Sequence, residues 1–378
     1  LDKDFRWLAG LYYLDDDTDI SIRNTAYSGI PGGPLTLADA LSGDWRVHQL
    51  GGSKNFAIFA DVSYDINDDL TLNLGGRYTK DKKKLSNDAV VLGVGRPGDF
   101  LAVAPIYAPY SINVSDSWTE FTPKASIEWD FDDDAMAYFS AAKGFKGGGW
   151  QGVAANATFA ERAYDPETAW TYEVGLKTEL LDRRVRLNIA SFYTDFQNLQ
   201  VELLDDVNLV LILENATDAK IRGHEIELEA KISSYLTAYT TASFLDTEYD
   251  NYVSAFSAED LSGNESFFSI DGLNETHQGL EYSIAYQPIP VLRIDARGHV
   301  SDWRFTDDLS YTYYEVIGDP SSSTNFDLYV KDVMVSGAPQ EAHNLILTGF
   351  WNTMKASVEV EHFGKQYPRW GYDGAIQD

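Results

Sequence analysis

The chain has 378 residues, 44% of them hydrophobic and 13% aromatic, and its formal net charge is −30. A polyanion requires a basic surface, so this charge excludes a nucleic-acid partner. The aromatic content indicates a folded protein, and the lack of cysteine excludes disulfides and thiolate metal sites. No stretch approaches the roughly 18 consecutive apolar residues of a membrane helix.

Thirteen extended segments are predicted in chain order, and most of them alternate between apolar and polar residues. The segment 223–232 shows the pattern clearly, because side chains of a strand point to opposite faces in turn. Its apolar side is Ile226, Leu228, Ala230 and Ile232, and its polar side is Glu225, Glu227, Glu229 and Lys231. The registers of 135–146 and 184–202 are less regular. The thirteen segments are 4–14, 54–64, 69–82, 117–130, 135–146, 168–180, 184–202, 218–232, 235–249, 276–287, 290–304, 341–351 and 355–366.

The connections fall into two lengths that alternate along the chain. Short turns are predicted at 67–68, 132–134, 181–183, 233–234, 288–289 and 352–353. Long loops are predicted at 15–53, 83–116, 147–167, 250–275 and 305–340, and 203–217 is intermediate. All turns therefore lie at one end of the strands and all loops at the other, as in outer-membrane barrels.

These features predict an all-β, transmembrane, antiparallel β-barrel. The strands of about ten to fifteen residues exceed the roughly 5–6 of an average strand and suit the ~9–11 that cross a membrane. The apolar sides then contact outer-membrane lipid, and Tyr and Trp near strand ends form an interfacial girdle. A soluble all-β carbohydrate-binding protein, which hides its apolar faces, remains an alternative. Bacterial single-chain barrels have an even number of strands and no open edge in lipid, so we expect the chain to be part of a larger barrel.

One region carries an ordered series of motifs. It contains SAAKGFKGGGWQG from residue 140, then YDPETAWTYEVGLKTELLDRRVRLNIASFYTDFQNLQV, then ENATDAKIRGHEIELEA ending near residue 230. This series resembles the middle of the barrel of TonB-dependent outer-membrane receptors. Looser agreement occurs at 7–13, 74–83, 122–129 and 277–289.

The resemblance implies a barrel of about 22 strands with an N-terminal plug inside it. Residues 1–378 would then be a partial barrel domain of about 13 strands, with the plug absent from the sequence. It implies an outer-membrane receptor of a Gram-negative bacterium, energised by the TonB-ExbB-ExbD complex through the plug. We expect uptake of a scarce nutrient, with an iron-siderophore complex preferred. Glycans, cobalamin or another nutrient are alternatives, as is a passive porin.

No enzyme activity or cofactor is expected. The six His residues are scattered, so no metal site is predicted. Asp132–Asp134 is interpreted as a solvated turn, because it lacks the glycine and terminal glutamate of a calcium loop. Gly144–Gly149 is interpreted as the end of a strand, because no helical pattern follows Trp150 and a phosphate loop needs one.

Aromatic residues of the long loops are the candidate ligand contacts. Ligand pockets favour rigid aromatic surfaces beside a few polar groups. The alternative is that these side chains only pack the loops together. The predicted contacts are Trp150, Gln151, Tyr164, Tyr107, Tyr110 and Tyr313.

Overall fold

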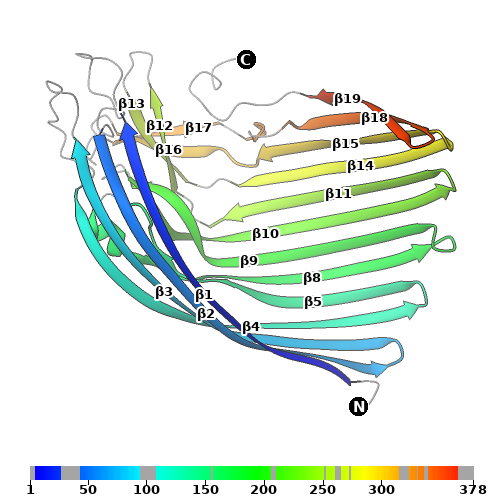
Figure 1. Cartoon of the computed structure of the whole chain (residues 1–378), viewed down its shortest axis with the longest axis horizontal. Helices are drawn as coiled ribbons and strands as arrows, with labels where there is room; N and C mark the ends of the chain where they lie inside the picture. The colour runs from blue at the N-terminus through cyan, green and yellow to red at the C-terminus, as the bar shows by residue number, and fades with distance from the viewer. Residues whose placement is uncertain are drawn as a thin grey trace.

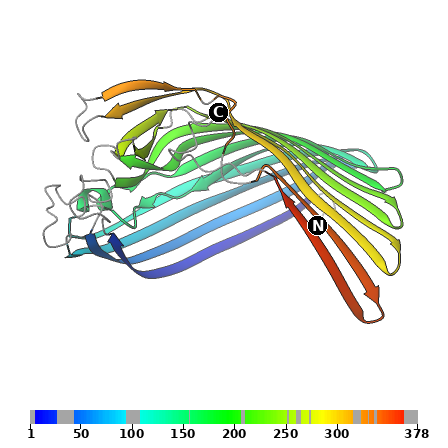
Figure 2. The same ribbon diagram turned by 90° about the horizontal axis from the view of Figure 1, so that it is seen from above.

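A thirteen-stranded antiparallel sheet dominates the structure, a computed structural model (Figure 1). Its strands follow one another in the order β1-β2-β3-β4-β5-β8-β9-β10-β11-β14-β15-β18-β19. The sheet is therefore a continuous meander with β1 and β19 at its described edges, and it curves into a trough (Figure 2). The structure describes residues 5–26, 43–93, 108–154, 156–205, 210–250, 253–259, 265–271, 274–314, 323–329, 331–335 and 339–364.

Each strand of this sheet corresponds to one predicted segment, so the predicted all-β antiparallel fold is confirmed. The strands are β1 (Phe5–Ala26), β2 (Gly43–Asn67), β3 (Leu70–Gly93), β4 (Tyr110–Asp132), β5 (Ala135–Lys146), β8 (Glu167–Leu180), β9 (Val185–Asp205), β10 (Val210–Ser233), β11 (Leu236–Tyr249), β14 (Glu275–Ile289), β15 (Leu292–Phe305), β18 (Glu341–Trp351) and β19 (Met354–Phe363).

The first four strands are much longer than predicted. They contain 22, 25, 24 and 23 residues. The prediction of loops at 15–53 and 83–116 is therefore wrong where these strands continue. The ladder persists there, since Asp16 pairs with Ser53 and Ser53 pairs with Lys83. The alternation reverses in this part, because apolar residues such as Val47 and Leu85 lie on the face that is polar elsewhere, and Lys82 and Lys84 lie on the other. The pattern of the membrane-spanning part therefore no longer marks the strand.

Six short turns join consecutive strands at one end of the sheet, as predicted. They connect β2 to β3, β4 to β5, β8 to β9, β10 to β11, β14 to β15, and β18 to β19. Figure 1 shows them along one end and the long connections at the other. We call these the turn end and the loop end.

Short elements occupy the long connections, where none was predicted. β12 (Val253–Glu259), β13 (Glu265–Asp271), β16 (Leu309–Tyr314) and β17 (Ser323–Leu328) form a four-stranded sheet. The segment between β5 and β8 holds a two-residue pair, β6 (Gly149–Trp150) with β7 (Ala163–Tyr164), and the short helix α2 (Ala157–Glu161). The expectation of no helix after Trp150 is thus wrong for five residues. Asn156 begins this helix by accepting a hydrogen bond from the Phe159 N–H at 3.2 Å.

The two faces of the large sheet differ in chemistry. On β3, Leu72, Leu74 and Tyr78 lie on one face and pair with Tyr64, Val62 and Ile58 of β2, so this apolar face continues across strands. The opposite, polar face carries Asn73, Arg77 and Thr79 on β3 and Glu225, Glu227 and Glu229 on β10. Apolar side chains of the first face are widely exposed, such as Leu11 at 72% and Val358 at 64%. Exposed apolar side chains over a whole sheet face require a lipid environment.

The described parts of the chain contain no helix that could cross a bilayer.

Candidate functional site

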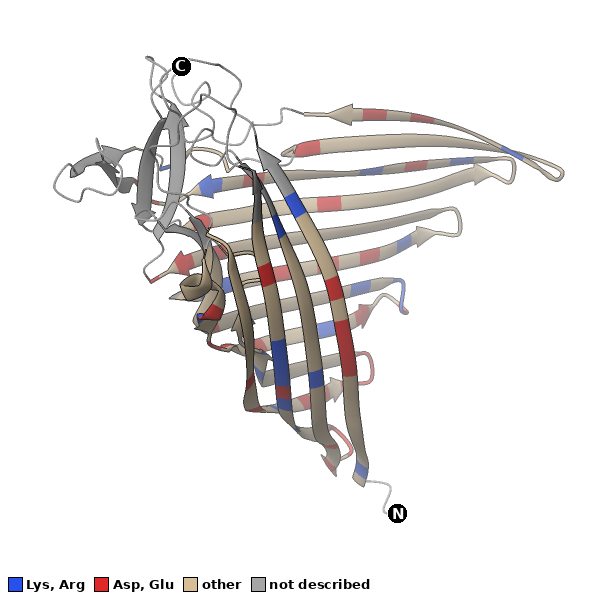
Figure 3. Ribbon diagram, turned by 60° about the vertical axis from the view of Figure 1, so that its left-hand side comes forward, with Lys and Arg blue, Asp and Glu red and all other residues tan. Residues whose placement is uncertain are grey.

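The connection between β5 and β8 folds over the polar face of the sheet at the loop end. We call residues 147–166 the inner loop. Lys83 of β3 donates to the Gly148 carbonyl at 2.7 Å, and Asn87 of β3 donates to the Gly152 carbonyl at 2.8 Å. Both side chains extend from the polar face. Figure 3 shows the curve of the sheet and the charged residues along its strands. The polar face is therefore the inside of the trough.

Glycines allow the inner loop to approach the sheet. A Cβ atom on Gly148 would lie 2.5 Å from the Tyr164 carbonyl oxygen and 2.6 Å from Trp118 Cε2. A Cβ atom on Gly147 would lie 2.4 Å from an Asp81 carboxylate oxygen. These distances are shorter than any real Cβ contact, so the GFKGGG motif permits close packing. This agrees with its interpretation as a strand end and not as a phosphate loop.

Aromatic rings and one cation gather under the inner loop. The rings of Trp118 on β4 and Trp150 on β6 are 5.5 Å apart at an angle of 59°. The Lys83 ammonium lies 5.8 Å from the centre of the Trp118 ring, within the range of a cation–π contact. Tyr164 is half-buried beside Gly149, and burial raises the pKa of its phenol. The Lys83 ammonium also lies 3.5 Å from the buried Asp81 carboxylate, so its charge is paired. This group therefore offers stacking surfaces, an ion-paired ammonium and one hydroxyl.

Two polar side chains, of which Gln200 is buried, hold the loop from the side of β9 and β10. Gln200 of β9 is buried and donates to the carbonyls of Gly147 at 3.2 Å and Asp165 at 3.0 Å. Asn215 of β10 forms two hydrogen bonds with the Asp165 backbone, at 2.6 and 2.8 Å. A buried amide is costly unless it is hydrogen-bonded, so these side chains fix the loop conformation.

A small apolar core supports the inner loop from the side of β2, β3 and β4. Ala154 and Ala160 of the loop pack on five buried residues of the sheet, and Trp150 and Phe159 lie against them. The five residues are Val47, Leu85, Ala89, Tyr110 and Ile112. The loop is thus anchored by packing on one side and by hydrogen bonds on both.

The structure brings four of the six predicted contacts into this region. Trp150, Gln151 and Tyr164 belong to the inner loop, and Tyr110 is buried in the core below it. Tyr313 lies elsewhere, in β16 of the four-stranded sheet, where it pairs with Phe268 and Thr324. Tyr107 falls outside the described residues.

Sequence reasoning missed Trp118, Lys83, Asn87 and Gln200. Trp118 carried a usable signal, because it is an aromatic residue in the polar phase of an otherwise alternating strand. Lys83 lies in the charged run 80–84, where periodicity gives no face. Asn87 and Gln200 contact the loop over 65 and 53 residues of sequence, a distance that a local pattern does not report.

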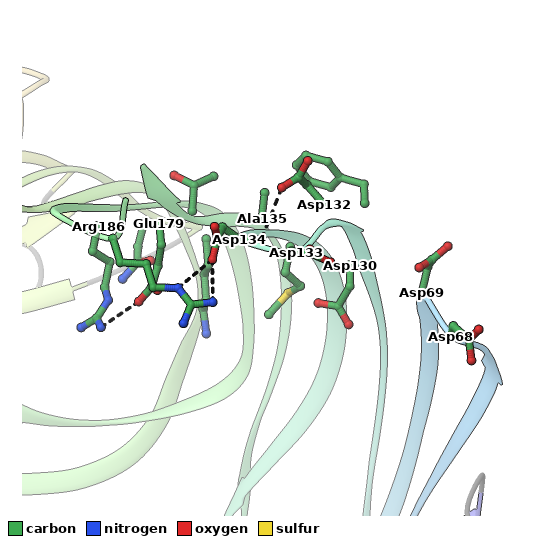
Figure 4. A pocket seen from close by; sticks show the side chains of 15 residues that line it. Asp68, Asp69, Asp130, Asp132, Asp133, Asp134, Ala135, Glu179 and Arg186 are labelled. Atoms are coloured by element: carbon green, nitrogen blue, oxygen red, sulfur yellow. Dashed lines mark hydrogen bonds and ion pairs between the residues drawn. The ribbon is translucent and has the colours of Figure 1, made fainter. Parts of the chain in front are cut away.

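An acidic hollow of about 820 Å³ lies at the turn end (Figure 4). Asp134 accepts a 2.8 Å hydrogen bond from Arg183, and Arg186 donates to Glu179 at 3.0 Å. No group in the described residues has three His, Asp or Glu side chains placed to hold a metal. Residues 132–134 connect β4 to β5, and Asp134 is paired with Arg183. The hollow is lined by Asp68, Asp69, Asp130, Phe131, Asp132, Asp133, Asp134, Ala135, Met136, Lys177, Thr178, Glu179, Arg183, Arg186 and Asn188.

The apolar outer face, the polar inner face and the two kinds of connection define a β-barrel wall of the outer membrane. An inner loop that carries aromatic side chains is fixed inside its loop end. The family model "TonB dependent receptor-like, beta-barrel" matches residues 2–242, and the chain belongs to this family. It is an outer-membrane protein, and the family consists of transport receptors.

Relatives agree with this assignment. The probable TonB-dependent siderophore receptor PiuA of Acinetobacter baumannii is 24% identical over 186 residues, 48% of this chain and 24% of the relative. The metal-pseudopaline receptor CntO of Pseudomonas aeruginosa is 24% identical over 127 residues, 34% of this chain and 17% of the relative. The matches thus span about a quarter or less of the length of these curated relatives.

Solved structures show the same fold. The siderophore receptor PiuA of A. baumannii has a TM-score of 0.58 at 17% identity, covering 94% of this chain and 48% of that one. The ferric yersiniabactin uptake receptor FyuA of Yersinia pestis has a TM-score of 0.54 at 14% identity, covering 96% and 52%. The chain therefore corresponds to about half of each receptor.

Proposed function

We propose that the chain is the barrel part of an importer that captures a ferric siderophore at the loop end. The proposal is supported by family membership and by the names of three relatives, which are a probable siderophore receptor (PiuA), a metal-pseudopaline receptor (CntO) and a ferric yersiniabactin uptake receptor (FyuA). The observation that carries it is the inner loop, which holds Trp150 and Tyr164 beside Trp118 and Lys83 on the inner wall. Rigid rings beside a few polar groups suit a ligand with flat groups that can stack on them.

Trp150, Gln151 and Tyr164 are the foremost proposed ligand contacts, and Trp118 joins them. Tyr110 acts through the core beneath the loop, because its side chain is buried. Tyr107 and Tyr313 are proposed as further contacts from other connections. The proposed work is capture and passage of the ligand, without covalent chemistry or a cofactor.

Energy for passage comes, in this proposal, from the TonB-ExbB-ExbD complex. It acts through a plug domain that lies outside residues 1–378 and fills the barrel. The described wall has an inner face of mixed charge, including Glu225, Glu227 and Arg186, suited to a hydrated or protein-filled interior. Glycan or cobalamin uptake would use the same mechanism with other loop contacts.

The test uses the whole receptor in cells and in detergent. Binding of a panel of ferric siderophores is followed by quenching of tryptophan fluorescence, and uptake is followed with radioactive iron in strains with and without TonB. Trp150→Ala should lower affinity for the bound siderophore about 5- to 150-fold, given about 1–3 kcal/mol for truncation of one buried aromatic contact. Trp129→Ala is the matched control, because it removes the same type of side chain from β4, on the apolar face near the turn end and away from the inner loop.

Different failures have different meanings. If the receptor binds glycans or cobalamin and none of the siderophores, the proposed ligand class is wrong and the proposed importer function stands. Entry that does not depend on TonB would indicate a passive porin. If Trp150→Ala binds the siderophore as tightly as the unaltered receptor does, the inner loop is not part of the binding site.

A further inference from the structure

A run of lysines begins where the apolar face of β3 ends. The apolar face of β3 extends over nine residues, from Leu70 to Tyr78, about the length that crosses a bilayer. The next three residues on this face are Lys80, Lys82 and Lys84, and all three are exposed. The residues between them point the other way, toward the inner loop.

Neighbouring strands complete a patch around these lysines. Lys82 pairs with Lys54 of β2, and Lys54 pairs with Asp15 of β1. We call Lys54, Lys80, Lys82 and Lys84 the lysine patch. On its other side, β4 places Thr119, Ser117 and Ser115 opposite Lys80, Lys82 and Lys84. The patch therefore combines ammonium groups with a row of hydroxyl donors.

The patch keeps an excess of positive charge. Lys54 lies 2.9 Å from Asp15, and Lys84 lies 2.8 Å from Asp17. Within the described residues, Lys80 and Lys82 have no carboxylate within 4.0 Å. Two ammonium groups thus remain uncompensated on a chain whose net charge is −30.

On β10, the basic residues that follow the apolar face toward the loop end are all paired with carboxylates. On β10 the apolar face passes from Ile226 and His224 to Arg222 and Lys220. Arg222 is 3.2 Å from both Asp246 and Glu248, and Lys220 is 2.7 Å from Asp250. Two cations meet three carboxylates there, so uncompensated positive charge is a property of the lysine patch and not of the whole rim.

We propose that the lysine patch binds the phosphate groups of lipid headgroups in the outer leaflet. Exposed aromatic residues border it on the membrane side, namely Tyr13, Phe56, Tyr78 and Phe121. Such rings mark the level of the headgroups. Lysine binds phosphate as a point charge, and the apolar face below supplies a surface for the acyl chains. The proposal depends on the membrane location of the sheet and is independent of the transported ligand.

The experiment compares lipids that differ only in phosphate. The whole receptor, in neutral detergent at low ionic strength, is titrated with diphosphorylated lipid A and with the same lipid after dephosphorylation, and retained lipid is counted by native mass spectrometry. The double variant Lys80→Gln with Lys82→Gln should bind the diphosphorylated lipid about 30-fold more weakly, from about 1 kcal/mol per basic residue near a lipid surface. The matched control, Lys220→Gln with Arg222→Gln, should bind as the unaltered receptor does.

Each outcome decides the proposal. The proposal is supported if only the Lys80 and Lys82 variant loses binding of the diphosphorylated lipid and if the unaltered receptor binds the dephosphorylated lipid weakly. Equal retention by this variant, or equal binding of both lipids, overturns it. Competition by millimolar inorganic phosphate as strong as that by lipid would also overturn it, because the site would then take free phosphate. Folding is checked by the heat-dependent gel mobility of each variant, and the single variant Lys82→Gln, expected to lose about fivefold, replaces the double variant if that fails to fold.

Discussion

Gly148→Ala should loosen the inner loop without unfolding the barrel wall. The new Cβ would meet the Tyr164 carbonyl at 2.5 Å and the Trp118 ring at 2.6 Å. The first contact is with backbone, which cannot rotate away, so the loop has to move. Overpacking by one methyl group costs about 1–3 kcal/mol, which increases the population of the open loop about 5- to 150-fold.

Hydrogen exchange of peptides from 147–160, measured by mass spectrometry in detergent, reports this opening. Gly144→Ala is the matched control, because its Cβ would lie 3.8 Å from the nearest atom, an ordinary contact. Faster exchange in Gly148→Ala and unchanged exchange in Gly144→Ala are expected. Equal protection of the loop in both variants would refute the close-packing argument.

Three further predictions follow from the same geometry. Asn87→Leu removes the fully buried donor to the Gly152 carbonyl and should cost about 1–3 kcal/mol of loop stability, seen as faster exchange at 152–154, while Asp88→Asn on the exposed face should change nothing. Burial raises the pKa of Tyr164 above its usual 10.0, so its contribution to loop stability is complete below pH 10 and is lost as the pH rises through the folded pKa. Tryptophan fluorescence between about pH 8 and 12 should show this loss, and Tyr164→Phe should reduce it; an identical alkaline transition in the variant would contradict the assignment. Finally, fluorophores on single cysteines at Leu228 and Ile294 should be quenched by brominated lipid, and one at Glu227 should not, because the first two lie on the apolar face; the reverse order would mean that the faces are assigned wrongly.

The membrane-spanning part of each strand was predictable because one face meets lipid and the other meets water. In β10, Ile226 and Leu228 alternate with Glu225 and Glu227, and the pattern ends near the border of the membrane. In β1 to β4 the ladder continues beyond that border, where Asp15 and Lys82 lie on the face that meets lipid elsewhere, and Val47 and Leu85 pack under the inner loop. The physical cause of the alternation is absent there, although the backbone hydrogen bonds remain.

The site was only partly predictable for a related reason. Aromatic residues in a glycine-rich connection indicated Trp150 and Tyr164 as candidate contacts, with packing of the loop as the alternative role. Their partners come from distant strands, and the partner amides of Asn87 and Gln200 look like ordinary polar positions in the sequence. Which polar residue bonds the loop depends on how the sheet brings β3 and β9 to its two sides.

The sheet is shorter at β5 and β8 than at the strands on either side. At the loop end, β5 and β8 reach only to Lys146 and Glu167, whereas β3, β4, β9 and β10 extend further. The chain that crosses this shorter part is fastened to the longer strands on both sides, by Lys83 and Asn87 on one side and by Gln200 and Asn215 on the other. The inner loop is more rigid when it is held on both sides than it would be if it were held on one side only. Loss of the hydrogen bonds on one side alone would let the inner loop move about the contacts that remain on the other side. The side that stays bonded would therefore set the direction of the movement.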